Sequence, residues 1–192
     1  SAAAVKQAVR AGVDLVGHAN YLDDEAVSLL ADRKGEVFVG PALAWEICYL
    51  THCESIGVSK QTVIDQGYKR EIEATVETVA KLREAGVRMV VGGDYGISIA
   101  PHGTYAKDLE YFVEYFDMRP LEALMCATNY GGLAFDPAGS VGTLTEGSFA
   151  DLVIVDGQPD QDIRVLQVHD RLTVMKGGMI YKGLANPNPY LA

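Results

Sequence analysis

The sequence lacks several features that would point to particular classes of protein. It has three cysteines, Cys48, Cys53 and Cys126, and none of them forms a CxxC pair. An odd number at this spacing supports neither a disulfide framework nor a zinc knuckle, so we expect reduced thiols and a cytoplasmic protein. No stretch approaches the roughly 18 consecutive apolar residues of a membrane-spanning helix, and we expect no membrane partner.

Positive charge is also scarce. The chain has 16 Lys and Arg against 26 Asp and Glu, a formal net charge of -10 and a pI near 4.8. No run rich in Lys or Arg occurs, which argues against a nucleic-acid partner or an anionic membrane surface. An N-terminal methionine is missing as well, because the chain begins with Ser1. We therefore expect the native polypeptide to extend further at this end.

Helices and short apolar strands alternate over the first two thirds of the chain. A length of 192 residues with 48% hydrophobic content is enough for one sizeable core. Strands separated by helices of this length call for right-handed crossovers and a parallel sheet, and apolar strands suit a sheet covered on both faces. The pattern predicts strands at 13–18, 37–39 and 87–91, helices at 2–11, 23–35, 59–85, 105–116 and from Pro120 to just before Gly131, and an irregular stretch at 44–58.

The pattern changes after residue 139. Short strands with glycine turns and no long helix are expected at 141–144, 150–156, 172–175 and 179–181, with a hairpin at Gly177 and Gly178. The organisation is therefore an α/β part over 1–139, an all-β part over 140–183 and an extended tail over 184–192.

Two of the expected strands deliver a polar side chain at their carboxyl end. The run VDLVGH ends in His18, and the run VVGGDYG brings Asp94 after a glycine turn. Ligands and catalytic groups collect at this end of parallel strands, so we interpret both residues as members of one site. The structural alternatives are a core histidine at His18 and an Asx turn at Asp94.

Six segments, in order, resemble the C-terminal half of the amidohydrolase superfamily, in the branch of imidazolonepropionase-like and prolidase-like enzymes. They are HANYLDDEAVSLLADR, VGGDYG, PHGTYAKDLEYFVE, RPLEALMCATNYGG, GTLTEGSFADLVIVDGQPDQDI and VMKGGMIYKG. The resemblance covers nearly all 192 residues. It implies an α/β fold with the last three strand-helix units of a distorted TIM (β/α) barrel in 1–139 and part of a small β-sandwich in 140–183.

The same resemblance implies roles for particular residues. His18 matches the metal-binding histidine at the end of the sixth barrel strand, and Asp94 matches the metal ligand and proton shuttle at the end of the eighth. His102 matches a histidine near the substrate mouth. Tyr95 stands where alanine is common and is expected to contact the substrate. Trp45 is a further candidate for the wall of the substrate pocket. One or two divalent metal ions are expected, with zinc favoured.

Other parts of the family's site are missing from this sequence. It contains no HxH pair, and the positions of the family's carboxylated lysine and fifth-strand histidine have no counterpart. Two ligands are fewer than the roughly three that catalytic zinc sites use. Three parallel strands also leave two unpaired edges, so we expect a complementary N-terminal half or a homo-oligomer.

The functional hypothesis is a metal-dependent hydrolase of C–N bonds in a small molecule: an amide, a dipeptide, a urea or a cyclic amide. The metal would lower the pKa of bound water to about 7 and supply hydroxide, while Asp94 would carry the proton to the leaving nitrogen. One alternative is a non-catalytic fragment or assembly subunit that needs a complementary chain. Another is a phosphoester or C–Cl hydrolase of the same superfamily, because the fold does not choose the chemistry.

Overall fold

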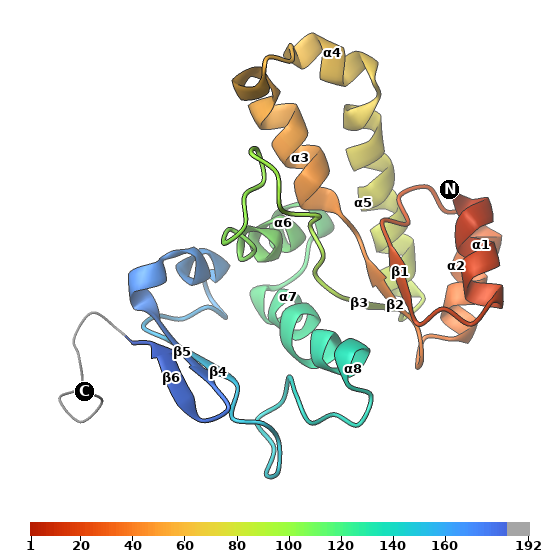
Figure 1. The fold of residues 1–192 in the computed structure, drawn as a ribbon. Helices are drawn as coiled ribbons and strands as arrows, with labels where there is room; N and C mark the ends of the chain where they lie inside the picture. The colour runs from red at the N-terminus through yellow and green to blue at the C-terminus, as the bar shows by residue number, and fades with distance from the viewer. Residues whose placement is uncertain (184–192) are drawn as a thin grey trace.

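A three-stranded parallel sheet and its connecting helices make up the N-terminal part of the chain (Figure 1). The structure is a computed structural model that describes residues 1–183, so the tail predicted for 184–192 lies outside the described residues. Strands β1 (Leu15–Gly17), β2 (Phe38–Gly40) and β3 (Arg88–Met89) lie side by side in this order. Val16 pairs with Val39, and Val39 pairs with Met89, both in parallel. The predicted parallel sheet is confirmed.

Eight α-helices connect and cover the strands within residues 1–183. Polar residues begin two of them: Asp23 Oδ1 accepts a hydrogen bond from the Ala26 amide at 2.9 Å, and Ser59 Oγ accepts one from the Thr62 amide at 3.1 Å. The helices are α1 (Ala2–Arg10), α2 (Asp24–Asp32), α3 (Leu43–His52), α4 (Lys60–Asp65), α5 (Tyr68–Glu84), α6 (Lys107–Phe116), α7 (Pro120–Met125) and α8 (Gly131–Phe135).

The prediction of an irregular stretch at 44–58 was wrong. Helix α3 and the 3-10 turn Cys53–Ile56 occupy most of it. Leu43, Ala44 and Ile47 are buried at helical spacing and hold α3 against the core. The three cysteines of the chain are unpaired and buried, which agrees with the expectation of reduced thiols.

Three further differences from prediction lie in segments that contain glycine. The helix expected at 59–85 is two helices, because Gly67 adopts φ 93° between α4 and α5. The helix from Pro120 does not stop before Gly131: it continues through the π-helical turn Cys126–Tyr130 into α8. A Cβ at Gly132 would collide with the Val141 carbonyl group, so this glycine lets the two backbone segments touch. Residues 141–144 form turns and no strand.

The hydrophobic core lies between the helices and the sheet, with Leu30, Leu43, Leu82 and Phe112 among its fully buried side chains. Strand β2 is buried along its whole length. In β1 only Val16 is buried, and Leu15 is 52% exposed. The expectation of a sheet covered on both faces therefore does not hold at β1.

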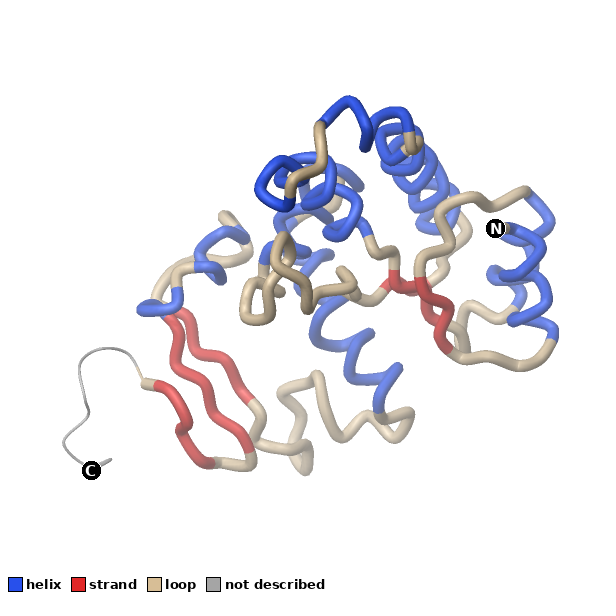
Figure 2. Tube along the Cα trace, turned by 45° about the horizontal axis from the view of Figure 1, so that its top comes forward, coloured by secondary structure: helices blue, strands red, loops and turns tan. Residues whose placement is uncertain are grey.

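The second sheet is antiparallel and contains β4 (Leu152–Val155), β5 (Leu172–Lys176) and β6 (Met179–Lys182). The predicted hairpin is confirmed: Gly177 and Gly178 have φ of 56° and 79°, and Asp151 Oδ1 accepts a 2.7 Å hydrogen bond from the Gly177 amide. Figure 2 shows helices and loops between the two sheets. The 3-10 helix Ile163–Gln167 joins this part to α6, because Gln167 Nε2 donates to Glu110 Oε2 at 2.7 Å.

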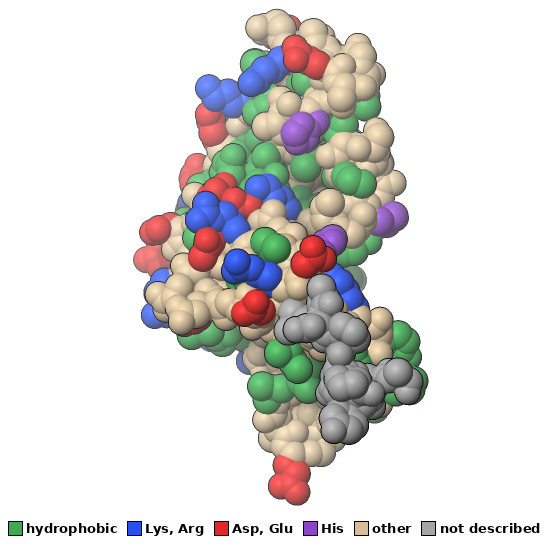
Figure 3. All heavy atoms as spheres, turned by 90° about the vertical axis from the view of Figure 1, so that its left-hand side faces the viewer, with side chains coloured by type: hydrophobic (Ala, Val, Ile, Leu, Met, Phe, Trp, Pro, Cys, Tyr) green, Lys and Arg blue, Asp and Glu red, His purple; other side chains and the backbone are tan. Residues whose placement is uncertain are grey.

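Acidic and basic side chains are interspersed on the face shown in Figure 3, with no continuous basic stripe there. Exposed ion pairs within residues 1–183 include Arg164 with Asp162, at 2.8 Å. None of the helices within residues 1–183 combines the length and the apolar character that crossing a membrane would require.

Leu82→Ala is expected to lower the free energy of unfolding by about 2–5 kcal/mol, because Leu82 is fully buried and the truncation leaves a cavity in the core. Glu73→Ala, on the exposed side of the same helix, is the matched control, with an expected effect within about 0.5 kcal/mol. Urea unfolding of both variants measures the difference. Equal effects would contradict the placement of the core against α5.

Candidate active site

The backbone is strained at the carboxyl ends of β1 and β3. Four non-glycine residues among 1–183 have a positive φ, and three of them lie at these two strand ends: His18 (65°), Ala19 (58°) and Asp94 (57°). A left-handed backbone costs non-glycine residues roughly 1–2 kcal/mol each and persists only where the surroundings hold it. Such positions cluster at functional sites, and here they coincide with the two candidate metal ligands.

His18 and Asp94 flank the carboxyl end of β2. The His18 amide donates to Gly40 O at 2.9 Å, and on the other side the Val90 amide donates to Val39 O at 2.9 Å. Both side chains are exposed, and no hydrogen bond or ion pair joins them within the described part of the chain. The sheet thus places both side chains at the carboxyl ends of its strands, without direct contact between them.

An imidazole and a carboxylate are the kinds of donor that zinc and related divalent ions accept. Their number falls short, because residues 1–183 contain no group of three or more His, Cys, Asp or Glu side chains arranged to hold a metal ion. The two side chains therefore fit a divalent metal in kind, but by themselves they would be fewer than a complete ligand set.

Asp108, at the start of α6, holds the turn that carries Asp94. Its buried carboxylate accepts hydrogen bonds from the Tyr95 hydroxyl, at 3.1 Å, and from the Gly93 and Gly92 amides. Burial raises the pKa of Asp108 to about 6, although these three hydrogen bonds act in the opposite direction. Three donors on one buried carboxyl group fix the turn.

Sequence analysis did not identify Asp108. A signal was present, since Asp108 lies on the same face of the amphipathic helix as the buried Leu109 and Phe112. A carboxylate on the apolar face of a helix needs partners from another element. The sequence alone does not say that these partners are the glycine amides.

Tyr95 and His102, two predicted substrate-binding residues, belong to one aromatic cluster. Tyr105 joins them: its ring meets the Tyr95 ring edge-on at 5.2 Å, and its hydroxyl pairs with His102 Nδ1 at 2.7 Å. Burial, followed by the charge of Asp108, raises the pKa of Tyr95 above its ordinary value. Tyr95 therefore stays neutral and donates a hydrogen bond to Asp108, while His102 is exposed.

Trp45 lies in a different aromatic group. Its ring stacks on Tyr49, with centroids 5.4 Å apart and planes within 7°, and Tyr49 meets Tyr68 edge-on at 4.8 Å. Within residues 1–183 no ring contact joins this group to the cluster of Tyr95 and His102. The structure thus separates Trp45 from the other predicted substrate residues.

A second buried carboxyl group, Glu46 of α3, lies close to the loop that follows β1. It accepts a hydrogen bond from Asn20 Nδ2 and a longer one from Thr75 Oγ1, at 3.4 Å. Burial, followed by repulsion from Glu71, raises the pKa of Glu46 to about 8. Glu46 is therefore largely protonated at neutral pH.

Parallel strands joined by helices, with polar side chains gathered at the strands' carboxyl ends, define the class of α/β enzymes that carry their sites at this edge. Residues 1–181 match the model of the "Amidohydrolase family". The chain belongs to the amidohydrolase family.

Three comparisons show the extent of the similarity. Ochratoxinase of Aspergillus niger is 31% identical over 183 residues, which is 94% of this chain and 36% of that protein. The crystal structure of A. niger ochratoxinase matches with a TM-score of 0.78 and 28% identity over 98% of this chain and 43% of that one. A crystal structure of a Xaa-Pro dipeptidase with bound methionine matches with a TM-score of 0.78 and 28% identity, over 95% of this chain and 43% of that one. The chain thus spans less than half the length of these relatives.

Gly93→Ala is expected to lower the free energy of unfolding by about 1–3 kcal/mol. A Cβ at Gly93 would collide with Asp108 Oδ1 and the Tyr95 ring and would lie 2.7 Å from Ala44 Cβ. Gly92→Ala is the matched control, because a Cβ there meets nothing within 4 Å. Thermal or urea unfolding of the pair checks this, and a Gly92 variant as destabilised as the Gly93 variant would be inconsistent with the packed turn.

Stability is expected to fall as the pH rises from about 4.5 to about 8, in part because of Glu46. Across this window the unfolded chain releases the Glu46 proton while the folded chain retains it, so raising the pH favours unfolding. Glu46→Gln cannot titrate and should flatten this part of the profile. Urea midpoints of both proteins at pH 5, 6.5 and 8, with exposed Glu73→Gln as the control, measure the difference. Parallel profiles for Glu46→Gln and the unaltered protein would show that Glu46 is ionised across the window.

Proposed function

We propose that this chain is the C-terminal part of a metal-dependent hydrolase that cleaves C–N bonds, with amides and dipeptides as the favoured substrates. The observation that carries the proposal is the strained pair His18 and Asp94 at the carboxyl edge of the parallel sheet, in a chain of the amidohydrolase family. The names of the relatives favour the same bond type, since one is a Xaa-Pro dipeptidase.

His18 and Asp94 would hold the metal ion, with zinc favoured and one or two ions in the complete site. When bound, the metal would acidify water and polarise the scissile carbonyl. The Asp94 carboxylate takes the proton from the attacking water and delivers it to the leaving nitrogen, as a general base and then a general acid. Asp108 keeps the Asp94 turn fixed through Gly92 and Gly93. Fixed geometry matters because a displaced proton shuttle loses most of its effect.

Tyr95, His102 and Tyr105 would form one wall of the substrate site. The loop 95–105 brings their rings together next to Asp94. Aromatic rings with polar tips contact an apolar substrate group and still offer hydrogen bonds at the rim. Trp45 would contact only a larger substrate, because it lies in the separate stack with Tyr49.

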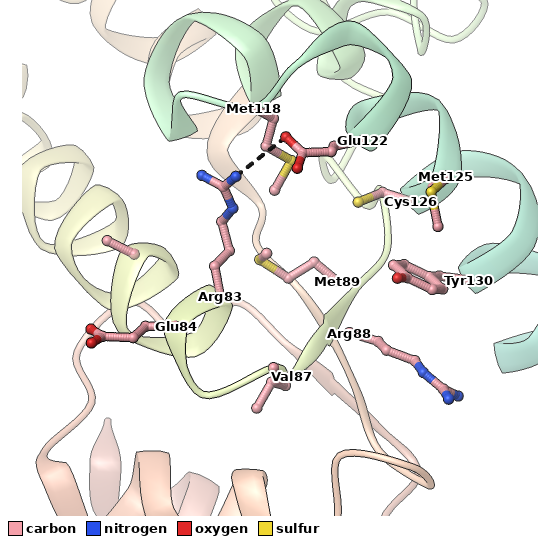
Figure 4. Close-up of a pocket in the computed structure, with 12 residues that line it drawn as sticks. Arg83, Glu84, Val87, Arg88, Met89, Met118, Glu122, Met125, Cys126 and Tyr130 are labelled. Atoms are coloured by element: carbon pink, nitrogen blue, oxygen red, sulfur yellow. Dashed lines mark hydrogen bonds and ion pairs between the residues drawn. The ribbon is translucent and has the colours of Figure 1, made fainter.

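The missing ligands would come from a complementary N-terminal half, which would pair with both edges of the sheet. At the β3 edge an open cavity of about 530 Å³ has Met89, Met118, Met125 and Cys126 among its lining residues (Figure 4). At the β1 edge a cavity of about 430 Å³ lies beside the half-exposed Leu15. Unpaired strand edges next to partly apolar hollows are suited to further strands, and such pairing would close a barrel.

The same partner would also cover the second sheet. Val153, Ile154, Met179 and Tyr181 are each more than half exposed, which leaves much apolar surface on a sheet of three strands. In this proposal residues 1–139 are the last three strand-helix units of the barrel, and residues 140–183 are the return strands of a small β-sandwich.

The proposal predicts that His18→Ala and Asp94→Asn lower the metal content and reduce amide hydrolysis at least about 100-fold, because each removes a ligand and Asp94 also moves the proton. The measurement is metal analysis with N-acyl amino acid and Xaa-Pro dipeptide assays on the protein as isolated, after an intact mass has established which chains are present.

Asp117→Asn and His169→Ala are the matched controls, since Asp117 is also a left-handed, exposed aspartate (φ 51°) and His169 is exposed on the second sheet's side. Metal content unchanged in His18→Ala, or equal losses in the Asp94 and Asp117 variants, would overturn the proposal. A preparation that stays folded without metal or activity would favour a non-catalytic assembly subunit.

A further inference from the structure

The side-chain amide of Asn20 lies between two carboxyl groups from two different helices. Asn20 Nδ2 donates one hydrogen bond to Glu46 Oε1 of α3 and another to Glu71 Oε1 of α5, at 3.1 Å. Glu46 is 2% exposed and Asn20 is 6% exposed, so these contacts are shielded from water. Both hydrogens of this amide are therefore used inside the protein.

The backbone of Asn20 is held as well. Thr78 Oγ1 of α5 donates to the Asn20 carbonyl at 2.9 Å, and the Leu22 amide reaches the same hydroxyl at 3.5 Å. Asn20 directly follows the two left-handed residues His18 and Ala19. Hydrogen bonds of Asn20 thus connect the strained turn to α3 and α5.

Glu46 is an unusual residue for this place, because within residues 1–183 it forms no ion pair with a cation. Asn20 from the β1 loop and Thr75 from α5 donate hydrogen bonds to it. Glu71 and Tyr68 of α5 also lie near it, and Glu71 repels it. Buried ionisable groups without a cation usually cost stability, and an apolar residue of similar size is often tolerated as well or better. A contribution to stability therefore does not explain Glu46, whereas a contribution to the geometry of the loop does.

We propose that Glu46 is a positioning residue for His18: its carboxyl group holds the amide of Asn20 and thereby fixes the left-handed turn that aims the His18 imidazole. This inference rests on the proposed function, in which His18 is a metal ligand. It goes further, because it assigns a role to a residue that touches neither metal nor substrate. Outer partners of this kind typically change metal affinity by 10–100-fold when they are removed.

The test compares three variants in the protein as isolated. Glu46→Met removes the acceptor and keeps the volume, whereas Glu46→Gln retains an oxygen that accepts from Asn20. Thr75→Val is the matched control, because it removes a hydroxyl from the same buried cluster without touching Asn20. Two quantities are measured below each variant's unfolding temperature: amide hydrogen exchange of residues 18–21 in the metal-free protein, and zinc affinity by competition with a chelator.

We expect Glu46→Met to speed exchange in residues 18–21 at least about 10-fold and to weaken zinc binding by about 10–100-fold. Glu46→Gln and Thr75→Val should stay within about threefold of the unaltered protein in both measurements. If Glu46→Met lowers only the unfolding temperature and leaves exchange and affinity unchanged, the residue is structural and the inference is wrong.

Two further outcomes are distinguishable. If the unaltered protein binds no zinc, the proposed function fails, and the exchange measurement alone decides whether Glu46 holds the turn. If Glu46→Met does not fold, Asn20→Ala removes the other end of the same hydrogen bond. Its hydrogen exchange and zinc affinity are then judged by the changes expected for Glu46→Met, and unchanged values would overturn the inference.

Discussion

The candidate site depends on holding a left-handed backbone at residues that are not glycine. His18, Ala19 and Asp94 each resist this conformation, so the turns after β1 and β3 would relax without outside contacts. Two buried carboxyl groups provide such contacts from helices elsewhere in the chain. Asp108 of α6 accepts hydrogen bonds from the backbone amides of Gly92 and Gly93, and Glu46 of α3 accepts one from the side-chain amide of Asn20. Helix α3 follows β2 and fixes the loop after β1, whereas α6 follows β3 and fixes the turn after the same strand.

This dependence links the chemistry of the site to the packing of the helices. The apolar faces of α3, α5 and α6 share one core with β1 and β2, and this core sets where Glu46 and Asp108 can reach. Burial also raises the pKa of both carboxyl groups, and no cation among residues 1–183 pairs with either to offset the loss of water. The helices thus set both the position and the protonation state of Glu46 and Asp108, which hold the turns of the candidate site. In the proposed function the open strand edges are the complementary feature, since they would leave room for ligands from an N-terminal half.

Prediction from sequence succeeded where the signal was local and periodic. The apolar runs ending in His18 and Asp94 gave the strands, helix spacing gave α1, α2 and α6, and Gly177 with Gly178 gave the hairpin. It failed where a glycine or a tertiary contact decided the outcome. Gly67 splits an expected helix through its positive φ, whereas Gly132 lies inside a helix and its missing Cβ admits the Val141 backbone. The same residue type therefore has different roles at the two positions, and only the surroundings distinguish them.

The sequence by itself determined the family, the order of the three parallel strands, and the two polar residues at the strand ends, because these follow from motifs and from short-range periodicity. Tertiary structure alone decided which side chains meet. Asp108 lies 14 positions after Asp94 and binds its turn, Glu46 lies 26 positions after Asn20, and Tyr105 joins Tyr95 to His102. Such pairings depend on how α3, α5 and α6 pack on the sheet. Packing sums many weak contacts over the whole chain, and no local pattern encodes that sum.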